Sequence, residues 1–419
     1  MEPTQIDAAY LTADVPGVGG RIKVAPGDFQ VEEVPLYEPC GEGTHVYFQV
    51  EKTGLSTMRA VRDVARALDV RHRDIGYAGL KDADAVTRQV FSVEHVDPER
   101  VRVLDVPRIQ IGWVRRHGNK LKLGHLWGNR FVIRVRDADL TRIKDVRIML
   151  DRLTLRGVPN VFGPQRFGRR GDTWEIGRAM IRQDWKEAID VMLGRPTDQD
   201  VDAVREARAR YEANDYAGAA EVWPRAFRDE QRACRALAQT RGSHKRAFFS
   251  VDAPLKRLYI SAYQSYLFNA VVGERLGELD RLIDGDLAWL HDKGAVFSVE
   301  DASVEQPRCD RFEISPSGPM FGYRMTEPAG APAEIEMRVL AEAGLTPADF
   351  RIQGGHKVKG ARRPLRFQPT EVAVDAGEDE QGGYLELRFA LRAGCYATAL
   401  LREVCKTPEM DSPAAGIEH

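Results

Sequence analysis

Residues 76–89 read Gly-Tyr-Ala-Gly-Leu-Lys-Asp-Ala-Asp-Ala-Val-Thr-Arg-Gln. Two glycines come first, a lysine and an aspartate follow them, and the stretch ends in a strand-like tail. Glycine permits tight backbone turns that other residues resist. Lys81 and Asp82 are therefore expected at a turn, and residues 86–93 form the strand that follows. A carboxylate beside a cationic side chain is suited to act as a nucleophile or a base. The alternative is a turn or capping aspartate.

Strand and helix patterns precede this stretch. Phe29 and Val31 alternate with polar neighbours, which predicts a short half-buried strand after the turn at Pro26. Residues 45–50 end in Tyr-Phe-Gln-Val and predict the next strand. An N-cap at residue 56 or 57, followed by apolar residues at helical spacing, predicts a helix to about residue 70.

The clearest alternation follows the opening stretch, in residues 130–136. Phe131, Ile133 and Val135 are expected to face one way, and the arginines at positions 130, 134 and 136 the other. This pattern predicts a sheet with one apolar face and one basic face or edge. The first part of the chain is therefore predicted to be α+β, with mostly antiparallel strands.

After Asp139 the chain becomes mainly helical. Periodicity predicts helices over residues 142–155, 200–211, 229–239, 255–279 and 335–343. Residues 315–322 are rich in proline and glycine and indicate turns, whereas residues 351–369 are basic and lack periodicity. A strand at 382–391 and a helix at 394–406 are predicted near the end. Strands at both ends of the chain indicate a helical domain inserted into an α+β domain.

Composition disfavours several classes of protein. With 43% hydrophobic and 30% charged residues, the 419-residue chain fits a soluble globular protein of two or three domains. No apolar run approaches the roughly 18 residues of a membrane span, and the first residues lack a signal pattern, so a cytoplasmic protein is expected. The five cysteines form no Cys-x-x-Cys pair and the histidines no His-Glu-x-x-His spacing, which disfavours a metal site.

The charges are unevenly distributed, although the net charge is only −2. Residues 100–136 contain ten Arg or Lys and one acid, and residues 351–370 contain six basic residues and no acid. Acids gather instead in residues 371–380. Concentrated basic segments fit a phosphate backbone, and they fit a solvated charged face equally well.

Four blocks, in the same order along the chain, resemble the signatures of the TruD family of pseudouridine synthases. They are residues 79–89, Val-Pro-Asn-Val-Phe-Gly-Pro-Gln-Arg-Phe-Gly at 158–168, Ser-Ala-Tyr-Gln-Ser-Tyr-Leu-Phe-Asn at 261–269 and Gly-Cys-Tyr-Ala-Thr-Ala-Leu-Leu-Arg-Glu at 394–403.

This resemblance implies an α+β catalytic domain with a mixed, mainly antiparallel sheet, interrupted by a mostly helical insertion specific to the family. Residues 1–157 and 366–408 are then the catalytic domain, 158–365 the insertion, and 409–419 a disordered tail.

The resemblance also implies a reaction. The uracil of a tRNA uridine, number 13 in the D arm, leaves C1′ through N1 and reattaches through C5, without a cofactor. The target base must leave its stack to be reached. Cleavage of the glycosidic bond builds positive charge at C1′, which favours a nearby carboxylate. Asp82 is the implied carboxylate, as nucleophile or as base, whereas Asp84 occupies a variable place and is expected to be dispensable.

Further residues of the implied site lie outside the opening stretch. By their positions in the motifs, Lys23 is the cationic partner of Asp82 and Phe131 stacks on the uracil. Asn129 is expected to face the same way as Phe131 and to bind the substrate, and Phe29 to line the pocket. Without the resemblance, Lys23 reads as a surface lysine and Phe131 as a core residue.

The expected partner is tRNA, bound by a monomer that needs neither a membrane nor a metal. Basic residues in or near the motifs and the basic segments are the expected phosphate contacts. They are Arg116, Lys120, Arg166, Arg169 and Arg362.

Two other functions fit parts of the sequence. A non-catalytic RNA-binding protein also carries basic segments, but it has no need of Lys23, Asp82, Asn129 and Phe131 together. A hydrolase with paired carboxylates would use Asp82 and Asp84, which point the same way if both lie on a strand. Such an enzyme needs a sugar pocket rich in aromatic residues, and the sequence marks none.

Overall fold

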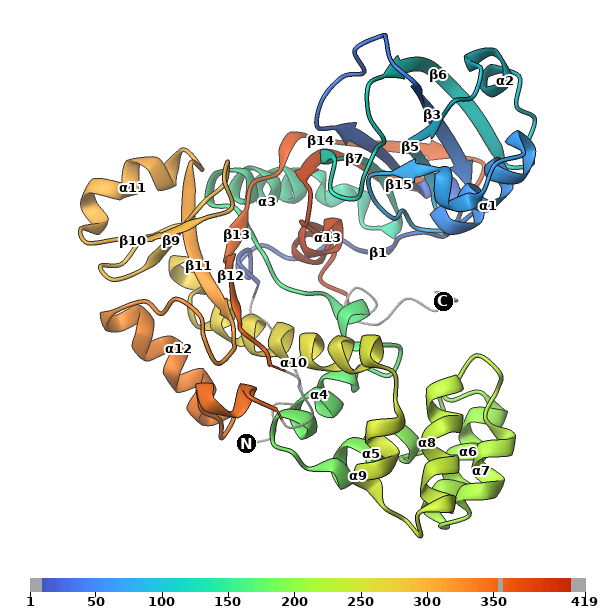
Figure 1. The fold of residues 1–419 in the computed structure, drawn as a ribbon. Coiled ribbons are helices and arrows are strands. Elements are labelled where there is room, and N and C mark those ends of the chain that lie inside the picture. Colours follow the sequence, from blue (N-terminus) through green and yellow to red (C-terminus); the bar gives the residue numbers. More distant parts are fainter. Residues whose placement is uncertain (1–9, 353–356, 408–419) are drawn as a thin grey trace. The chain divides into compact units, whose positions relative to one another are not determined.

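The structure is a computed structural model that describes residues 10–352 and 357–407, and these form two compact units (Figure 1). The split unit comprises residues 10–158 and 367–407, and the inserted unit comprises residues 159–352 and 357–366. The predicted tail, 409–419, lies outside the described residues. The predicted α+β class, with a mixed and mainly antiparallel sheet, is confirmed.

The split unit is organised around one mixed sheet. Its strands follow the order β14-β15-β7-β2-β5-β3-β6, with β1 beside β7 and β4 beside β5. β2 runs parallel to β5, whereas β7 runs antiparallel to both β2 and β15. The strands are β1 Gly19–Arg21, β2 Phe29–Pro35, β3 His45–Thr53, β4 Gly76–Tyr77, β5 Val86–Glu94, β6 Ile109–His117, β7 Leu126–Ala138, β14 Thr370–Asp379 and β15 Gly382–Arg392.

The apolar face of β7 is buried as predicted. Phe131, Ile133 and Val135 are 7%, 0% and 0% exposed, and they pair in register with the apolar residues of β15. The helices of this unit also bury apolar faces, and Ser56 caps the first of them by accepting a hydrogen bond from the Arg59 N–H. They are α1 Thr57–Leu68, α2 Pro98–Arg102, α3 Ile143–Arg156 and α13 Ala397–Cys405.

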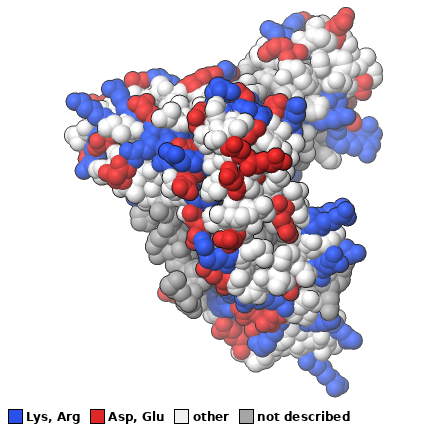
Figure 2. Space-filling view, turned by 90° about the vertical axis from the view of Figure 1, so that its left-hand side faces the viewer, with Lys and Arg blue, Asp and Glu red and all other residues white. Residues whose placement is uncertain are grey.

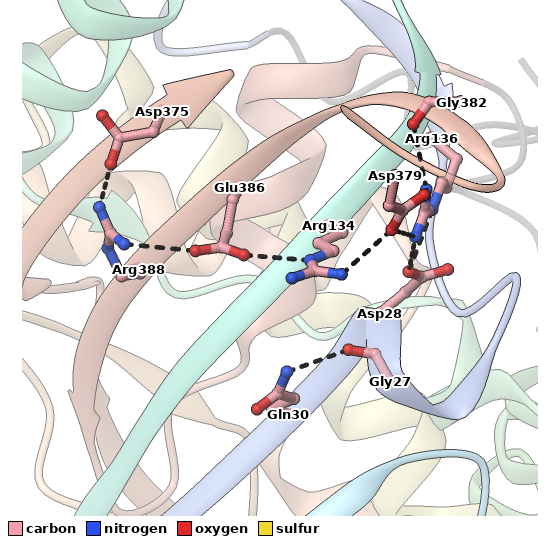
Figure 3. A network of polar contacts seen from close by, with 10 residues as sticks. All are labelled: Gly27, Asp28, Gln30, Arg134, Arg136, Asp375, Asp379, Gly382, Glu386 and Arg388. Atoms are coloured by element: carbon pink, nitrogen blue, oxygen red, sulfur yellow. Dashed lines mark hydrogen bonds and ion pairs between the residues drawn. The ribbon is translucent and has the colours of Figure 1, made fainter. Parts of the chain in front are cut away.

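The opposite face of β7 carries charges of both signs (Figure 3). Arg136 Nη2 lies 2.6 Å from Asp28 Oδ1, and its Nη1 lies 2.6 Å from Asp379 Oδ1. Arg134 Nε donates to Glu386 Oε2 at 3.0 Å. The sequence alone suggested a basic face here, and the structure corrects this, because acids from neighbouring elements pair with these arginines. Figure 2 likewise shows Lys and Arg interspersed with Asp and Glu over the face in view.

The inserted unit combines a helical part with a small sheet. Figure 1 shows α6, α7 and α8 packed side by side in this unit. Its helices are α4 Thr173–Ile181, α5 Trp185–Leu193, α6 Asp202–Glu212, α7 Tyr216–Val222, α8 Arg228–Gln239, α9 His244–Ser250, α10 Ala253–Glu274, α11 Ala302–Asp310 and α12 Gly330–Glu342. The sheet has the order β10-β9-β11-β12, with β9 Leu287–Leu290, β10 Val296–Ser298, β11 Ile314–Met320 and β12 Ala361–Pro364.

One prediction for this unit was wrong. Residues 315–322 were expected to form turns, but most of them belong to β11, between β9 and β12. Gly318 serves close packing here, because a Cβ at this position would lie 2.7 Å from Leu365 and 3.1 Å from Phe268. Glycine in a strand often marks such a close approach rather than a turn.

The chain passes between the units at residues 158/159 and 366/367, near the short strands β8 Val158–Pro159 and β13 Arg366–Phe367. Short 3-10 helices complete the structure: η1 Pro26–Asp28, η2 His72–Asp74, η3 Leu140–Arg142, η4 Pro164–Phe167, η5 Leu276–Glu278 and η6 Pro347–Phe350. Within residues 10–352 and 357–407, no helix combines the length and apolarity needed to cross a membrane.

Candidate active site

Asp82 lies in the loop that joins β4 to β5. Gly76, at the start of β4, is buried, and a Cβ there would lie 2.4 Å from the Leu121 carbonyl oxygen and 2.5 Å from Ser92 Oγ. Glycine is thus needed at this position for close approach of the chain. The strand after the loop begins at Val86, as predicted. The loop therefore starts and ends on strands that are anchored in the sheet.

The structure brings Lys23 and Asp82 together. Lys23 Nζ lies 2.6 Å from Asp82 Oδ2, and the two side chains are 16% and 39% exposed. Lys23 has a φ of 58°, in the left-handed region. For a non-glycine residue this conformation costs on the order of 1 kcal/mol and is often found at functional sites. The carboxylate is thus paired with a cation and remains open to solvent.

Lys52 holds the backbone of Asp82. Its side chain on β3 is fully buried, and Nζ donates to the Asp82 carbonyl at 2.9 Å and to the Leu55 carbonyl. Burial lowers the pKa of Lys52 to about 8, although the negative charge of Asp82 opposes this shift. Sequence reasoning missed this residue. The available signal was its place in phase with the buried Phe48 and Val50 on β3.

Lys81 ties the same loop to the sheet. Its Nζ lies 3.1 Å from Glu33 Oε2 and donates to Asn129 Oδ1 at 2.6 Å, and the Lys81 and Glu33 side chains are 5% and 1% exposed. Glu33 and Asn129 are register partners on β2 and β7. Thr57 Oγ1, at the start of α1, accepts the backbone N–H of Lys81 at 2.8 Å. Glu33 was also missed, although it lies in phase with Phe29 on β2.

Three phenylalanines lie together on the face of the sheet that carries Glu33 and Asn129. The Phe131 ring lies 6.3 Å from Phe29 in an edge-to-face arrangement and stacks on Phe389 at 5.3 Å. Lys23 Nζ lies 4.6 Å from the centre of the Phe29 ring, so the aromatic group adjoins the Lys23–Asp82 pair. Phe29 and Phe131 are 4% and 7% exposed, and their rings also belong to the core of the sheet.

Asp84 does not form a second carboxylate of this site on a strand. Both Asp82 and Asp84 precede β5, in the loop, and Asp84 is exposed. The hydrolase alternative required both acids on one strand, so its geometric basis is absent. The arrangement instead offers one solvent-accessible carboxylate, Asp82, paired with Lys23 beside aromatic rings.

The predicted phosphate contacts differ in exposure. Arg116 and Arg169 are exposed, and Lys120 is half-buried with Nζ donating to the Arg73 carbonyl at 2.6 Å. Arg166 is half-buried and donates to Ser265 Oγ at 3.1 Å.

Arg362 is the exception among these residues. It is 9% exposed, and its guanidinium forms a two-point ion pair with Glu336 at 2.8 and 2.7 Å. A further donor of the same guanidinium binds the Ser317 carbonyl at 2.5 Å. These contacts occupy the donors that a phosphate would need, so Arg362 has a structural role in the inserted unit.

Comparisons with known proteins show the family to which the chain belongs. The family model described as tRNA pseudouridine synthase D (TruD) matches residues 5–404. A tRNA pseudouridine synthase D of Geobacter sulfurreducens is 48% identical over 408 residues, which cover 97% of this chain and 99% of that protein. One from Anaeromyxobacter dehalogenans strain 2CP-C is 38% identical over 411 residues, with 97% and 99% coverage. The crystal structure of a putative tRNA pseudouridine synthase D from Methanosarcina mazei is 27% identical, has a TM-score of 0.86 and covers 96% of this chain and 97% of its own.

Proposed function

Because the chain belongs to the tRNA pseudouridine synthase D family, we propose that it converts uridine 13 in the D arm of tRNA to pseudouridine, with Asp82 as its catalytic carboxylate. The observation that carries this proposal is the 2.6 Å contact between Lys23 Nζ and Asp82 Oδ2 on a solvent-accessible loop. Asp82 is 39% exposed there, which leaves it reachable by a substrate.

The proposed reaction rests on the family and is compatible with this contact. The bond between N1 and C1′ breaks, a bond between C5 and C1′ forms, the C5 hydrogen leaves as a proton, and N1 gains one. The flipped uridine brings C1′ to the Asp82 carboxylate, which acts as nucleophile or as base while positive charge develops on the sugar. Lys23 orients the carboxylate through the Nζ–Oδ2 contact.

The remaining residues position the loop and the base. Since Asn129 Oδ1 accepts from Lys81, its Nδ2 end is the part of the amide that can donate to a uracil carbonyl. Phe131 and Phe29 supply an aromatic surface for the ring. We assign the predicted phosphate contacts to Arg116, Lys120, Arg166 and Arg169, and we leave out Arg362 because its donors are occupied.

Two substitutions test the catalytic role. Asp82→Asn is expected to abolish tritium release from tRNA labelled at uridine C5, while the protein still folds and binds tRNA. Asp84→Asn serves as the matched control and is expected to retain most activity, because Asp84 occupies a variable place in the family signature. Full activity of Asp82→Asn would refute the assignment.

The same assay separates the enzyme from a non-catalytic RNA-binding protein. If the wild-type protein only binds RNA, it releases no tritium. If it is the enzyme, it releases one C5 hydrogen for each pseudouridine formed. Sequencing the modified position in the product tRNA tests the assignment to uridine 13.

A further inference from the structure

The inserted unit contains a pocket of about 720 Å³ that has no part in the proposed chemical step, although Arg169, one of the proposed phosphate contacts, lines it. It lies where α4, α6 and α8 begin, since its lining includes residues 169–173, residues 199–201, Phe227 and Glu230. All of its lining residues belong to the inserted unit. Its volume falls in the range of pockets that hold small ligands.

Three helix N-termini meet at this pocket. Within the described residues, the N-caps Asp172 of α4, Val201 of α6 and Phe227 of α8 make no side-chain hydrogen bond to the first turn. The helices contain 9, 11 and 12 residues. The first N–H groups of a helix lack intrahelical partners, and the helix dipole attracts negative charge to this end. Uncapped N-termini therefore favour a phosphate group.

A buried guanidinium provides independent evidence of a ligand. Arg208 lines the pocket and is 7% exposed, and its Nη1 donates to the Gly194 carbonyl at 2.6 Å. Its Nε is buried, and it has no hydrogen-bond partner among the described residues. Asp200 Oδ1, at 3.6 Å from Nε, is too far for a hydrogen bond.

Arg170 shows the same feature on another element of the lining. Its Nε lies 3.2 Å from Asp172 Oδ2, while its Nη1 is buried without a hydrogen-bond partner in the part of the chain that the structure describes. Buried donors left without partners cost free energy, so two of them in one pocket indicate a ligand that accepts hydrogen bonds.

The rest of the lining suits a nucleobase. Phe227 and Tyr259 contribute aromatic rings, on which bases stack with little regard to their identity. Three acids, Asp172, Asp200 and Glu230, also line the pocket, and burial raises the pKa of Asp172 and Glu230. This shift disfavours the charged forms of Asp172 and Glu230, and a carboxylate that stays ionised repels an anion.

We propose that this pocket binds one nucleotide unit, with its phosphate at Arg170, Arg208 and the helix N-termini and its base against Phe227 and Tyr259. The inference rests on the proposed function, because the tRNA substrate is the expected source of the nucleotide. A free nucleotide presents the same chemistry, so the experiment distinguishes the two sources.

The test measures binding by the full chain, with 5′-AMP as the free probe and an unmodified tRNA transcript as the RNA probe. Arg170→Gln is expected to weaken AMP binding about tenfold or more, the loss typical of a charge-assisted hydrogen bond. Glu230→Gln is expected to strengthen it, because the substitution removes a negative charge from the pocket. Arg257→Gln, an exposed position on α10, is the control and should stay within about twofold of wild type. Adenosine, which lacks the phosphate, should bind at least tenfold more weakly than AMP.

The outcomes separate the sources and the proposals. Weaker binding of both AMP and tRNA by Arg170→Gln assigns the pocket to an RNA nucleotide, and weaker binding of AMP alone assigns it to a free nucleotide. The proposal is overturned if wild type does not bind AMP at millimolar concentration and Arg170→Gln binds tRNA like wild type. If Arg170→Gln weakens AMP binding and Glu230→Gln strengthens it, a general loss of folding does not explain the results. Thermal melting of each variant checks its folding directly. Tritium release by wild type at saturating tRNA reports on the proposed reaction separately.

Discussion

Replacing Lys52 with methionine should separate activity from stability. Lys52 is fully buried, and its pKa is lowered from 10.5 to about 8, so the buried ammonium costs roughly 3 kcal/mol at neutral pH. Methionine removes this cost, but it also removes the hydrogen bonds to the Asp82 and Leu55 carbonyls. Each bond to a charged donor contributes about 1.5–3 kcal/mol. The two effects oppose each other, so the free energy of unfolding should fall by about 0–3 kcal/mol.

Activity is expected to respond differently. Lys52 holds the backbone of Asp82, and a misplacement of about 1 Å in a catalytic group can cost on the order of a hundredfold in rate. Lys52→Met should therefore lower kcat for tritium release tenfold to a hundredfold, with little change in the Kd for tRNA. Lys144→Met, at an exposed position on α3, is the matched control and should retain wild-type values.

The measurements are urea unfolding, tRNA binding and single-turnover tritium release on the same preparations. Wild-type kcat in a folded Lys52→Met variant would refute the view that this lysine positions Asp82. A large loss of stability would instead show that the hydrogen bonds outweigh the cost of burying the ammonium.

Two further predictions concern the same loop. Glu33→Gln leaves the buried Lys81 ammonium without its counter-ion, so the free energy of unfolding measured in urea should fall by about 3–5 kcal/mol. The control is Glu32→Gln, on the other face of β2, which should change this free energy by less than about 1 kcal/mol. Between pH 8 and 10.5 the unfolded chain keeps the Lys52 proton that the folded chain has released. The wild type should therefore gain stability relative to Lys52→Met as the pH rises through this range, by roughly 3 kcal/mol in all. An identical pH dependence in the two proteins would contradict the lowered pKa.

The main elements of the split unit could be predicted because their sequences repeat with simple periods. Phe131, Ile133 and Val135 alternate along β7, and the helix from Thr57 shows both a cap and an apolar face. The order of the strands could not be predicted in this way, because it depends on contacts between distant segments. β14 illustrates this: its sequence shows only a cluster of acids, and the pairing of Asp379 with Arg136 of β7 comes from the structure.

Only part of the candidate site could be predicted from the sequence. The motifs placed Lys23 and Asp82 in one site, and the structure brings them within 2.6 Å of each other. Lys52 and Glu33 were missed because single polar residues within an apolar alternation are easily read as solvent-facing. A buried charge is tolerated when a partner from another strand or loop meets it, and such a partner is not visible in the local sequence.

Three lysines surround the Asp82 loop, and their contacts give them different roles. Lys23 touches the carboxylate, whereas Lys52 contacts the backbone carbonyl and Lys81 contacts Glu33 and Asn129. Buried charges are costly compared with apolar side chains, so stability alone does not account for Lys52 and Lys81. Their directional contacts restrict where the loop can lie, which apolar packing would do less specifically. Substitution of Lys23 should therefore affect the chemical step directly, and substitution of the other two should affect it through the position of Asp82.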